Sequence, residues 1–267
     1  MKAEKKVFAA IVIGACAVVV CGVLNLLGYP ALFETDTKSR AVSTLSQTSA
    51  QEAIEEIYEP WDVNSAPNYY LVLGPAELSA EVSSLAVGEF AYAPLDELGR
   101  ATGCTAKITY ALIEQANNDG RDSLDDLDPT GWGHNEVVSI ELMDGSTYTG
   151  WFWNRSHLIA DSLGGCAELE NLVCGTRMQN VGSNGAHGQD PGGMAYTETK
   201  TREWLYEHTD GYVCYSATPI YQGDDLVCRA VIVDVLSCDG ELDLHVIVYN
   251  AALGYKIDYA TGEFQAS

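Results

Sequence analysis

The sequence has few positively charged residues. It contains 14 lysines and arginines against 38 aspartates and glutamates, for a formal net charge of −24 at pH 7. The first thirty residues have a net charge of +2, which leaves −26 on the rest. Nucleic-acid binding normally relies on lysines and arginines that neutralise phosphates. The charge therefore excludes long-range attraction of polyanions, and such a substrate would require a local cationic cleft or divalent cations.

The sequence also lacks the spacings that would assign a metal site directly. No Cys-x-x-Cys pair and no combined Cys/His spacing is present, which argues against a structural zinc site. The acidic stretch 119–128 does not have the spacing of an EF-hand loop, so we interpret it as a solvated loop. No internal repeat is apparent.

The N-terminus has the pattern of a membrane segment. Lys2, Lys5 and Lys6 precede an unbroken apolar run over residues 7–24. A secretory signal has an apolar core of only ~7–15 residues and a small-residue cleavage site. This run is longer, and it lacks a convincing cleavage site. We therefore predict an uncleaved signal anchor within residues 1–28, with a cleaved signal and a secreted protein as the alternative. The lysines should stay in the cytoplasm, so a single-pass membrane protein with its main domain outside is expected.

Residues 29–60 are predicted to form a stalk. The stretch 35–58 is rich in Ser, Thr, Ala, Gln and Glu, and it has little with which to build a core. A short helix is predicted over 49–57, where Ser49 and Glu52 fit a capping box. The folded domain is then expected to occupy residues 61–267.

Apolar periodicity and turn residues predict that this domain is α+β with a mainly antiparallel sheet. The clearest hairpin joins 137–142 to 147–153, because apolar and polar residues alternate and Asp144-Gly145 favours a turn with positive φ. Further strands are predicted within 90–109 and at 212–221, 226–237 and 242–250, and helices at 110–118 and 194–208.

Six cysteines lie outside the predicted anchor. An even count in an extracytoplasmic domain predicts up to three disulfides, although fifteen pairings are possible. A bond between Cys166 and Cys174 would brace the loop between them. The six are Cys104, Cys166, Cys174, Cys214, Cys228 and Cys238.

Polar residues that can carry chemistry are concentrated between Trp151 and Gly182. The tetrapeptide 154–157 reads Asn-Arg-Ser-His, Asn171 follows His157 by fourteen positions, and Asn180 lies nine further on. Histidine is suited to accept a proton near neutrality because its ordinary pKa is ~6.5. Taken alone, each of these residues is as well explained as a surface histidine or a turn asparagine.

The arrangement resembles the DNA/RNA non-specific endonucleases. This ββα-metal family has an Asp-Arg-Gly-His tetrapeptide followed by two spaced asparagines. The likeness extends from about Leu95 to Tyr259 and is greatest to the membrane-anchored, DNA-entry type of bacterial nuclease. It implies a ββα-metal finger on the sheet and a magnesium-dependent endonuclease, with Mn²⁺ as a substitute ion. The substrate would be DNA, with RNA as a second candidate.

The resemblance also implies roles for individual residues. His157 would be the general base, and Asn180 would be the direct metal ligand, since magnesium prefers hard oxygen donors. Asn171 would position the water or steady the hydration shell of the metal. Arg155 would contact phosphate or brace the loop.

Two further candidates lie on the predicted helix 194–208. Glu198 and Arg202 are four residues apart and so share a helix face. The resemblance implies that Glu198 holds a metal-bound water and that Arg202 stabilises the phosphate. The alternative is an ordinary surface ion pair. Arg177 and Lys200 are weaker candidates for phosphate contact.

The chain departs from the family pattern at two positions. Asn154 stands where the family has aspartate, and Ser156 stands where it has glycine. A neutral residue at 154 removes one carboxylate near the metal but still offers an amide oxygen. Together with the acidity, this motivates an alternative function, in which the chain is a catalytically weak surface protein that binds nucleic acid or another partner.

Overall fold

The computed structural model describes residues 58–183 and 191–267. The predicted anchor and nearly all of the predicted stalk, including the helix expected over 49–57, lie outside these residues. Within the described part of the chain, no helix has both the length and the apolar character that crossing a membrane requires.

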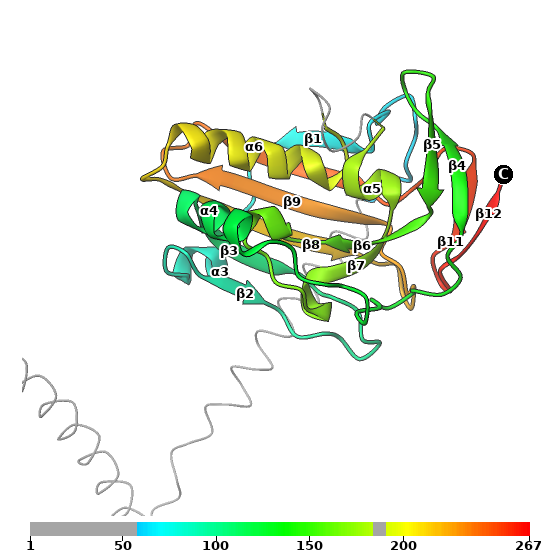
Figure 1. Cartoon of the computed structure of the whole chain (residues 1–267), viewed down its shortest axis with the longest axis horizontal. Coiled ribbons are helices and arrows are strands. Elements are labelled where there is room, and N and C mark those ends of the chain that lie inside the picture. The colour runs from blue at the N-terminus through cyan, green and yellow to red at the C-terminus, as the bar shows by residue number, and fades with distance from the viewer. Residues whose placement is uncertain (1–57, 184–190) are drawn as a thin grey trace, which may run out of the picture. The chain divides into compact units, whose positions relative to one another are not determined.

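A six-stranded antiparallel sheet forms the centre of the domain (Figure 1). Every adjacent pair of strands in it is antiparallel, which confirms the predicted α+β class. The strand order is β1-β10-β9-β8-β3-β2. The strands are β1 (Tyr70–Gly74), β2 (Phe90–Tyr92), β3 (Cys104–Thr109), β8 (Tyr212–Ile220), β9 (Ala230–Ser237) and β10 (Asp243–Tyr249).

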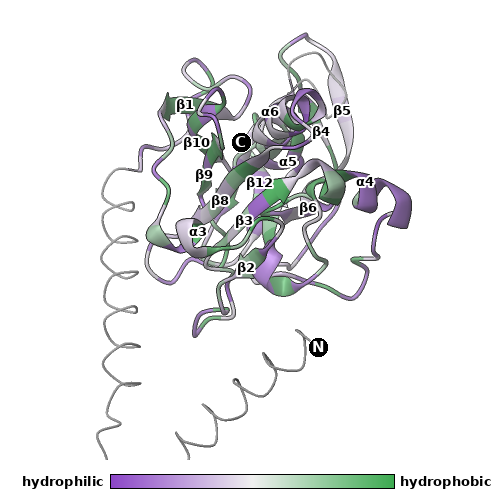
Figure 2. Cartoon of the chain, turned by 90° about the vertical axis from the view of Figure 1, so that its left-hand side faces the viewer, coloured by the Kyte–Doolittle hydropathy of each residue, from purple (hydrophilic) through white to green (hydrophobic). Residues whose placement is uncertain are grey.

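Helices α4 (Tyr110–Asp119) and α6 (Met194–Glu207) cover one face of the sheet (Figure 1). Ile113 of α4 and Leu205 of α6 pack into the core cluster that contains Val213 and Val233 of the sheet. Figure 2 shows the contrast between the hydrophobic strands and the hydrophilic end of α4. A short helix, α3 (Ala80–Ser84), precedes β2. This packing fixes α6, and with it the face that carries Glu198.

A second core lies beneath the hairpin of β4 (Val137–Glu141) and β5 (Thr147–Trp151). The predicted alternation is observed in β4, where Val138 and Ile140 are buried between exposed neighbours. A further hairpin, β11 (Tyr255–Asp258) and β12 (Glu263–Ala266), packs against the same cluster. The rings of Phe152 and Phe264 stack there with centroids 3.8 Å apart.

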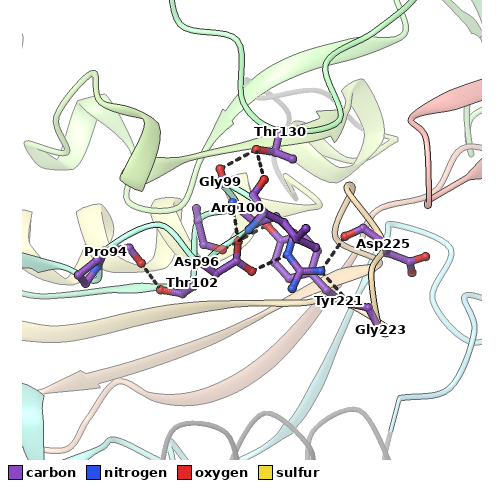
Figure 3. Close-up of polar contacts among 11 residues, drawn as sticks. Pro94, Asp96, Gly99, Arg100, Thr102, Thr130, Tyr221, Gly223 and Asp225 are labelled. Atoms are coloured by element: carbon purple, nitrogen blue, oxygen red, sulfur yellow. Dashed lines mark hydrogen bonds and ion pairs between the residues drawn. The ribbon is translucent and has the colours of Figure 1, made fainter. Parts of the chain in front are cut away.

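Arg100 ties two connections of the sheet together (Figure 3). Its Nε donates to Asp96 Oδ2 at 2.6 Å, and its Nη1 donates to the carbonyls of Gly223 and Asp225 at 2.9 and 2.8 Å. The guanidinium also lies 4.4 Å from the ring centroid of Tyr221. We interpret this network as structural, because the contacts with Gly223, Asp225 and Tyr221 join the β2–β3 connection to the β8–β9 connection, while Asp96 holds the guanidinium from within its own connection.

The cysteines leave one prediction unconfirmed. All six cysteines of the described residues are free thiols, so the structure does not confirm the expected disulfides. Cys174 is buried beside Cys228, where Asn250 Nδ2 donates to both of their carbonyls at 2.9 and 2.8 Å. Cys166 instead lies beside Tyr92, whose hydroxyl accepts from its backbone N–H at 3.1 Å. The two residues expected to bridge the loop therefore have different neighbours, with Cys174 in the second core and Cys166 only partly buried.

Candidate active site

Two paired strands and the short helix that follows them have the order of the predicted ββα finger. They are β6 (Trp153–His157), β7 (Leu172–Thr176) and α5 (Arg177–Val181), with His157 opposite Leu172 in the antiparallel pair. Thr176 begins the helix as its N-cap, since its Oγ1 accepts from Gln179 N at 2.9 Å. A Cβ at Gly175 would overlap both Gln179 and Ser156, so glycine lets the helix pack closely on β6. The finger places His157 and Asn180 on adjoining elements.

His157 ends β6 in a largely desolvated position. Burial lowers the pKa of His157 below its ordinary value of 6.5. Asp161 opposes this shift and Arg121 adds to it. Asp161 and Arg121 are themselves 3.7 Å apart, from Oδ2 to Nε. The imidazole is therefore neutral at pH 7 and able to accept a proton.

Glu198 and Arg202 lie on α6. Glu198 interacts electrostatically with Arg121, which also acts on His157. Burial raises the pKa of Glu198 to about 7, against the opposing effects of Arg202 and Arg121. Arg202 donates from Nη1 to Ser162 Oγ at 2.8 Å and from Nη2 to Thr199 Oγ1 at 2.9 Å. Arg202 thus joins α6 to the short turn Asp161–Leu163 that follows His157.

Asn180 projects from α5 toward the tetrapeptide. Its Oδ1 accepts from Ser156 Oγ at 3.3 Å, and its Nδ2 donates to Asn154 Oδ1 at 3.4 Å. Both hydrogen bonds are longer than the usual range and are therefore weak. The donor atoms are amide and hydroxyl oxygens. Magnesium and manganese prefer oxygen ligands, whereas softer ligands such as cysteine sulfur select zinc. The residues at this position fit a hard divalent cation.

Asn180 and Asn154 also line a surface hollow with a volume of about 550 Å³. Three aromatic side chains, Trp132, Tyr148 and Trp151, line the same hollow. His157, Glu198 and Arg202 do not line it. The predicted site residues therefore fall into two groups, which meet at the finger.

Asn171 is placed differently from the prediction. It is completely buried, and both its amide oxygen and its amide nitrogen make hydrogen bonds within the protein. Nδ2 donates to the carbonyls of Ile159 and Cys166, and Oδ1 accepts from Ile159 N, all at 2.9 Å, and from Cys104 Sγ at 3.5 Å. In this arrangement Asn171 braces the loop after His157, the task that we had expected of a disulfide.

Arg155 holds the acidic stretch 119–128 against the finger. It donates to Leu127 O at 2.8 Å and to Asp128 Oδ1 at 2.7 Å, and its guanidinium lies 4.4 Å from the ring centroid of Trp132. Of its two expected roles, the structure favours bracing the loop. The acidic stretch thus has a structural partner that its sequence did not reveal.

Sequence reasoning missed Asp161, Arg121 and Ser162. Asp161 and Arg121 act electrostatically on His157, Arg121 also acts on Glu198, and Ser162 accepts a hydrogen bond from Arg202. Arg121 lies in the acidic stretch and so appeared to be one solvated charge among many. The signal that could have found Asp161 is its position four residues after His157, at the start of a turn.

Comparisons with known proteins agree with the family resemblance that the sequence shows. A model of the family described as DNA/RNA non-specific endonuclease matches residues 80–237. A deoxyribonuclease of Streptococcus dysgalactiae subsp. equisimilis is 33% identical over 203 residues, which are 66% of this chain. The match spans 60% of the length of that relative.

Solved structures show the same likeness. The structure of Sda1 nuclease with bound zinc ion has a TM-score of 0.70 at 32% identity and is matched over 100% of its length and 78% of this chain. The structure of NucA from Streptococcus agalactiae with magnesium ion bound has a TM-score of 0.55 at 25% identity, with 82% of its length and 69% of this chain covered.

Proposed function

The chain belongs to the DNA/RNA non-specific endonuclease family, and from this premise we propose that it is a magnesium-dependent endonuclease that hydrolyses DNA, with RNA as a second substrate. The observation that carries the proposal is the finger itself. It joins a desolvated histidine, His157, to an oxygen-donor site at Asn180 and Asn154. Nothing in this arrangement reads a base edge, which agrees with cleavage that has no sequence preference.

His157 is the proposed general base. Phosphodiester hydrolysis needs a group that removes a proton from the attacking water, and a neutral imidazole nitrogen can accept it. Burial keeps the imidazole neutral at pH 7 because the charged form would lose solvation. Asp161 then partly stabilises the imidazolium once the proton has been transferred.

Asn180 and Asn154 would hold the metal through their amide oxygens. A bound divalent cation supplies charge stabilisation for the phosphate as the bond breaks. The names of the two structural neighbours mention zinc and magnesium. We favour magnesium, with Mn²⁺ as a substitute, because the donor atoms here are oxygens. Asn154 offers no negative charge, so metal affinity should be lower than with an aspartate.

Arg202 and Glu198 complete the proposed site from α6. The guanidinium of Arg202 is oriented by Ser162 and Thr199 and would stabilise negative charge on the phosphate. Glu198, with its pKa of about 7, can hold or release a proton near neutral pH and would orient a water. We assign positioning roles to Asn171 and Arg155 from the hydrogen bonds that they make within the protein.

The remaining proposals concern location. We propose that residues 1–28 anchor the chain, that 29–60 form a stalk, and that the domain 61–267 lies outside the membrane. The lysines before the apolar run support this orientation. The full-length protein should resist carbonate extraction, with its domain accessible to external protease. A soluble mature form that begins shortly after Tyr29 would show a cleaved signal instead.

Plasmid nicking tests the proposed activity directly. The full chain should convert supercoiled plasmid to open circles with magnesium and should not do so with EDTA. The neutral Asn154 and the net acidity favour one competing function, a surface protein that binds without cleaving. Binding of nucleic acid with no nicking at any magnesium or manganese concentration would support that competitor.

A further inference from the structure

The hollow beside Asn180 has an aromatic wall that the proposed chemistry does not use. We call it the aromatic groove and define it by Trp132, Tyr148, Trp151, Arg155, Arg177 and Asn180, which all line it. Trp151 ends β5 with 57% of its surface exposed. An exposed tryptophan in a hollow of about 550 Å³ is a surface on which a flat ligand can stack.

Tyr148 is held in place along β5. Its hydroxyl donates to Trp151 O at 3.0 Å, and its ring lies against Gly150. A Cβ at Gly150 would overlap the hydroxyl and ring of Tyr148, so the ring occupies this position only because residue 150 is glycine. The Tyr148 ring is therefore held in place beside Gly150, and Trp151 at the end of the same strand also lines the groove.

Two arginines supply positive charge to the same groove. Arg177 lies 5.4 Å from the ring centroid of Tyr148, and Arg155 lies 4.4 Å from that of Trp132. Arg155 is paired with Asp128. Within residues 58–183 and 191–267, no carboxylate forms an ion pair with Arg177. Arg177 is thus available to a phosphate in a protein that is otherwise strongly acidic.

The groove is continuous with the proposed metal position. Arg177 and Asn180 are three residues apart on α5 and so lie on the same face of the helix. A polynucleotide whose phosphate contacts Asn180 would therefore place its neighbouring nucleotides against Arg177, Tyr148 and Trp151. Stacking suits an acidic protein, because base–aromatic stacking does not depend on net charge and every base has a π-face.

We propose that the aromatic groove binds the unpaired bases of single-stranded nucleic acid, with Trp151 and Tyr148 stacking on bases and Arg177 contacting phosphate. The inference rests on the proposed function, since it names the form of substrate that the same site accepts. Bases within a duplex are already stacked on each other and cannot present their faces to the groove. Single strands and locally opened duplexes should therefore be favoured over intact duplex.

The test measures binding in EDTA, where cleavage is stopped. A labelled oligothymidylate and a blunt hairpin duplex of equal length are titrated with the full chain, and fluorescence anisotropy is recorded. Trp151→Ala should weaken single-strand binding by ~5- to 150-fold, the equivalent of one lost stack. Trp151→Phe keeps a π-face and should retain most of the affinity.

Two further variants control for structure. Val137 lies directly opposite Trp151 on β4, is also 57% exposed and does not line the groove. Val137→Ala should bind like the parent protein. Gly150→Ala adds a single carbon where the Tyr148 ring lies, and it should weaken binding although Trp151 is intact. Unchanged melting temperatures show that the variants are folded.

The outcomes separate this inference from the proposed function. If the parent protein nicks plasmid with magnesium but Trp151→Ala and Gly150→Ala bind oligothymidylate as tightly as the parent, the inference is wrong and the nuclease stands. Equal affinity for single strand and duplex would also overturn it, as would no binding of oligothymidylate by the parent. Binding as expected without any cleavage would overturn the proposed nuclease and leave the groove as a binding site.

Discussion

The two ends of the β6–β7–α5 finger differ in burial and in charge. At one end, desolvation lowers the pKa of His157 and raises that of Glu198 on the neighbouring helix α6, so that burial favours the neutral form of each group. At the other end, Asn154 and Asn180 are neutral amides that line an open hollow of about 550 Å³. A group that exchanges protons near pH 7 benefits from burial, whereas a group that holds a hydrated cation and a polymer must remain accessible. The predictions below test this division.

Removing the proposed base should have the largest effect. His157→Ala deletes the proton acceptor and leaves the oxygen donors of Asn180 and Asn154 in place. Cleavage should fall by roughly two to four orders of magnitude, with the magnesium dependence of the residual rate unchanged. The measurement is plasmid nicking over a magnesium titration. A shift of that titration without loss of maximal rate would assign His157 to the metal end.

Asn171→Ala should mainly reduce stability. It leaves the buried N–H and C=O of Ile159 and the carbonyl of Cys166 without their partners. Because each orphaned buried group costs about 1–3 kcal/mol, we expect a loss of about 3 kcal/mol in the free energy of unfolding, measured by urea denaturation. Asn118→Ala, on the exposed side of α4, is the matched control. Loss of cleavage at unchanged stability would instead give Asn171 a part in the chemistry.

Changes at Asn180 and Asn154 should alter the magnesium concentration that cleavage requires. Asn180→Ala removes the proposed ligand, and activity at low magnesium should fall by ~10- to 100-fold and recover at higher magnesium or with manganese. Asn154→Asp adds a carboxylate to the same donor set and should lower the magnesium concentration that gives half-maximal rate. Nicking rates across a metal titration measure both effects. No displacement of the titration by either variant would remove both residues from the metal site.

Replacing Glu198 should produce the smallest effect, a change in how the free energy of unfolding depends on pH. Its pKa of about 7 in the folded protein exceeds the ordinary 4.5, so between these values the folded state binds more protons than the unfolded state. Stability should therefore fall as pH rises through this window. Glu198→Gln, neutral throughout, should remove a decline on the order of 2 kcal/mol, measured by urea denaturation at pH 5 and 8. An identical decline in the variant would contradict the assigned burial.

The regular parts of the fold were predictable because their signals are local. Alternation in 137–141 and the Asp144-Gly145 turn identified the β4–β5 hairpin, and α4 and α6 begin at the predicted residues. The strands β1, β11 and β12 were missed. They are short, and β11 and β12 depend on contacts such as Phe264 with Phe152 that no local pattern encodes.

The partners of the candidate site residues were harder to predict than their placement on the finger. Spacing and resemblance proposed His157 and Asn180, and the structure places them on β6 and α5. The hydrogen bonds of Asn171 to Ile159 and Cys166 are local, but its contact with Cys104 joins residues 67 positions apart and could not be foreseen from the sequence. The effects of Arg121 on His157 and Glu198 are likewise long-range. Such contacts depend on how α4 and α6 pack on the sheet. Sequence periodicity predicts the two helices separately but not their packing.

Chemical rescue tests the division between a proton-handling end and a metal-binding end most directly. His157→Gly opens a space that imidazole can enter and in which it can accept the proton. We expect cleavage by His157→Gly to rise with added imidazole, in proportion to its neutral form, whereas Asn180→Ala should respond to manganese and not to imidazole. If both variants cleave plasmid at the parent rate while circular dichroism shows them folded, or if imidazole rescues Asn180→Ala as well, the account of this site is wrong.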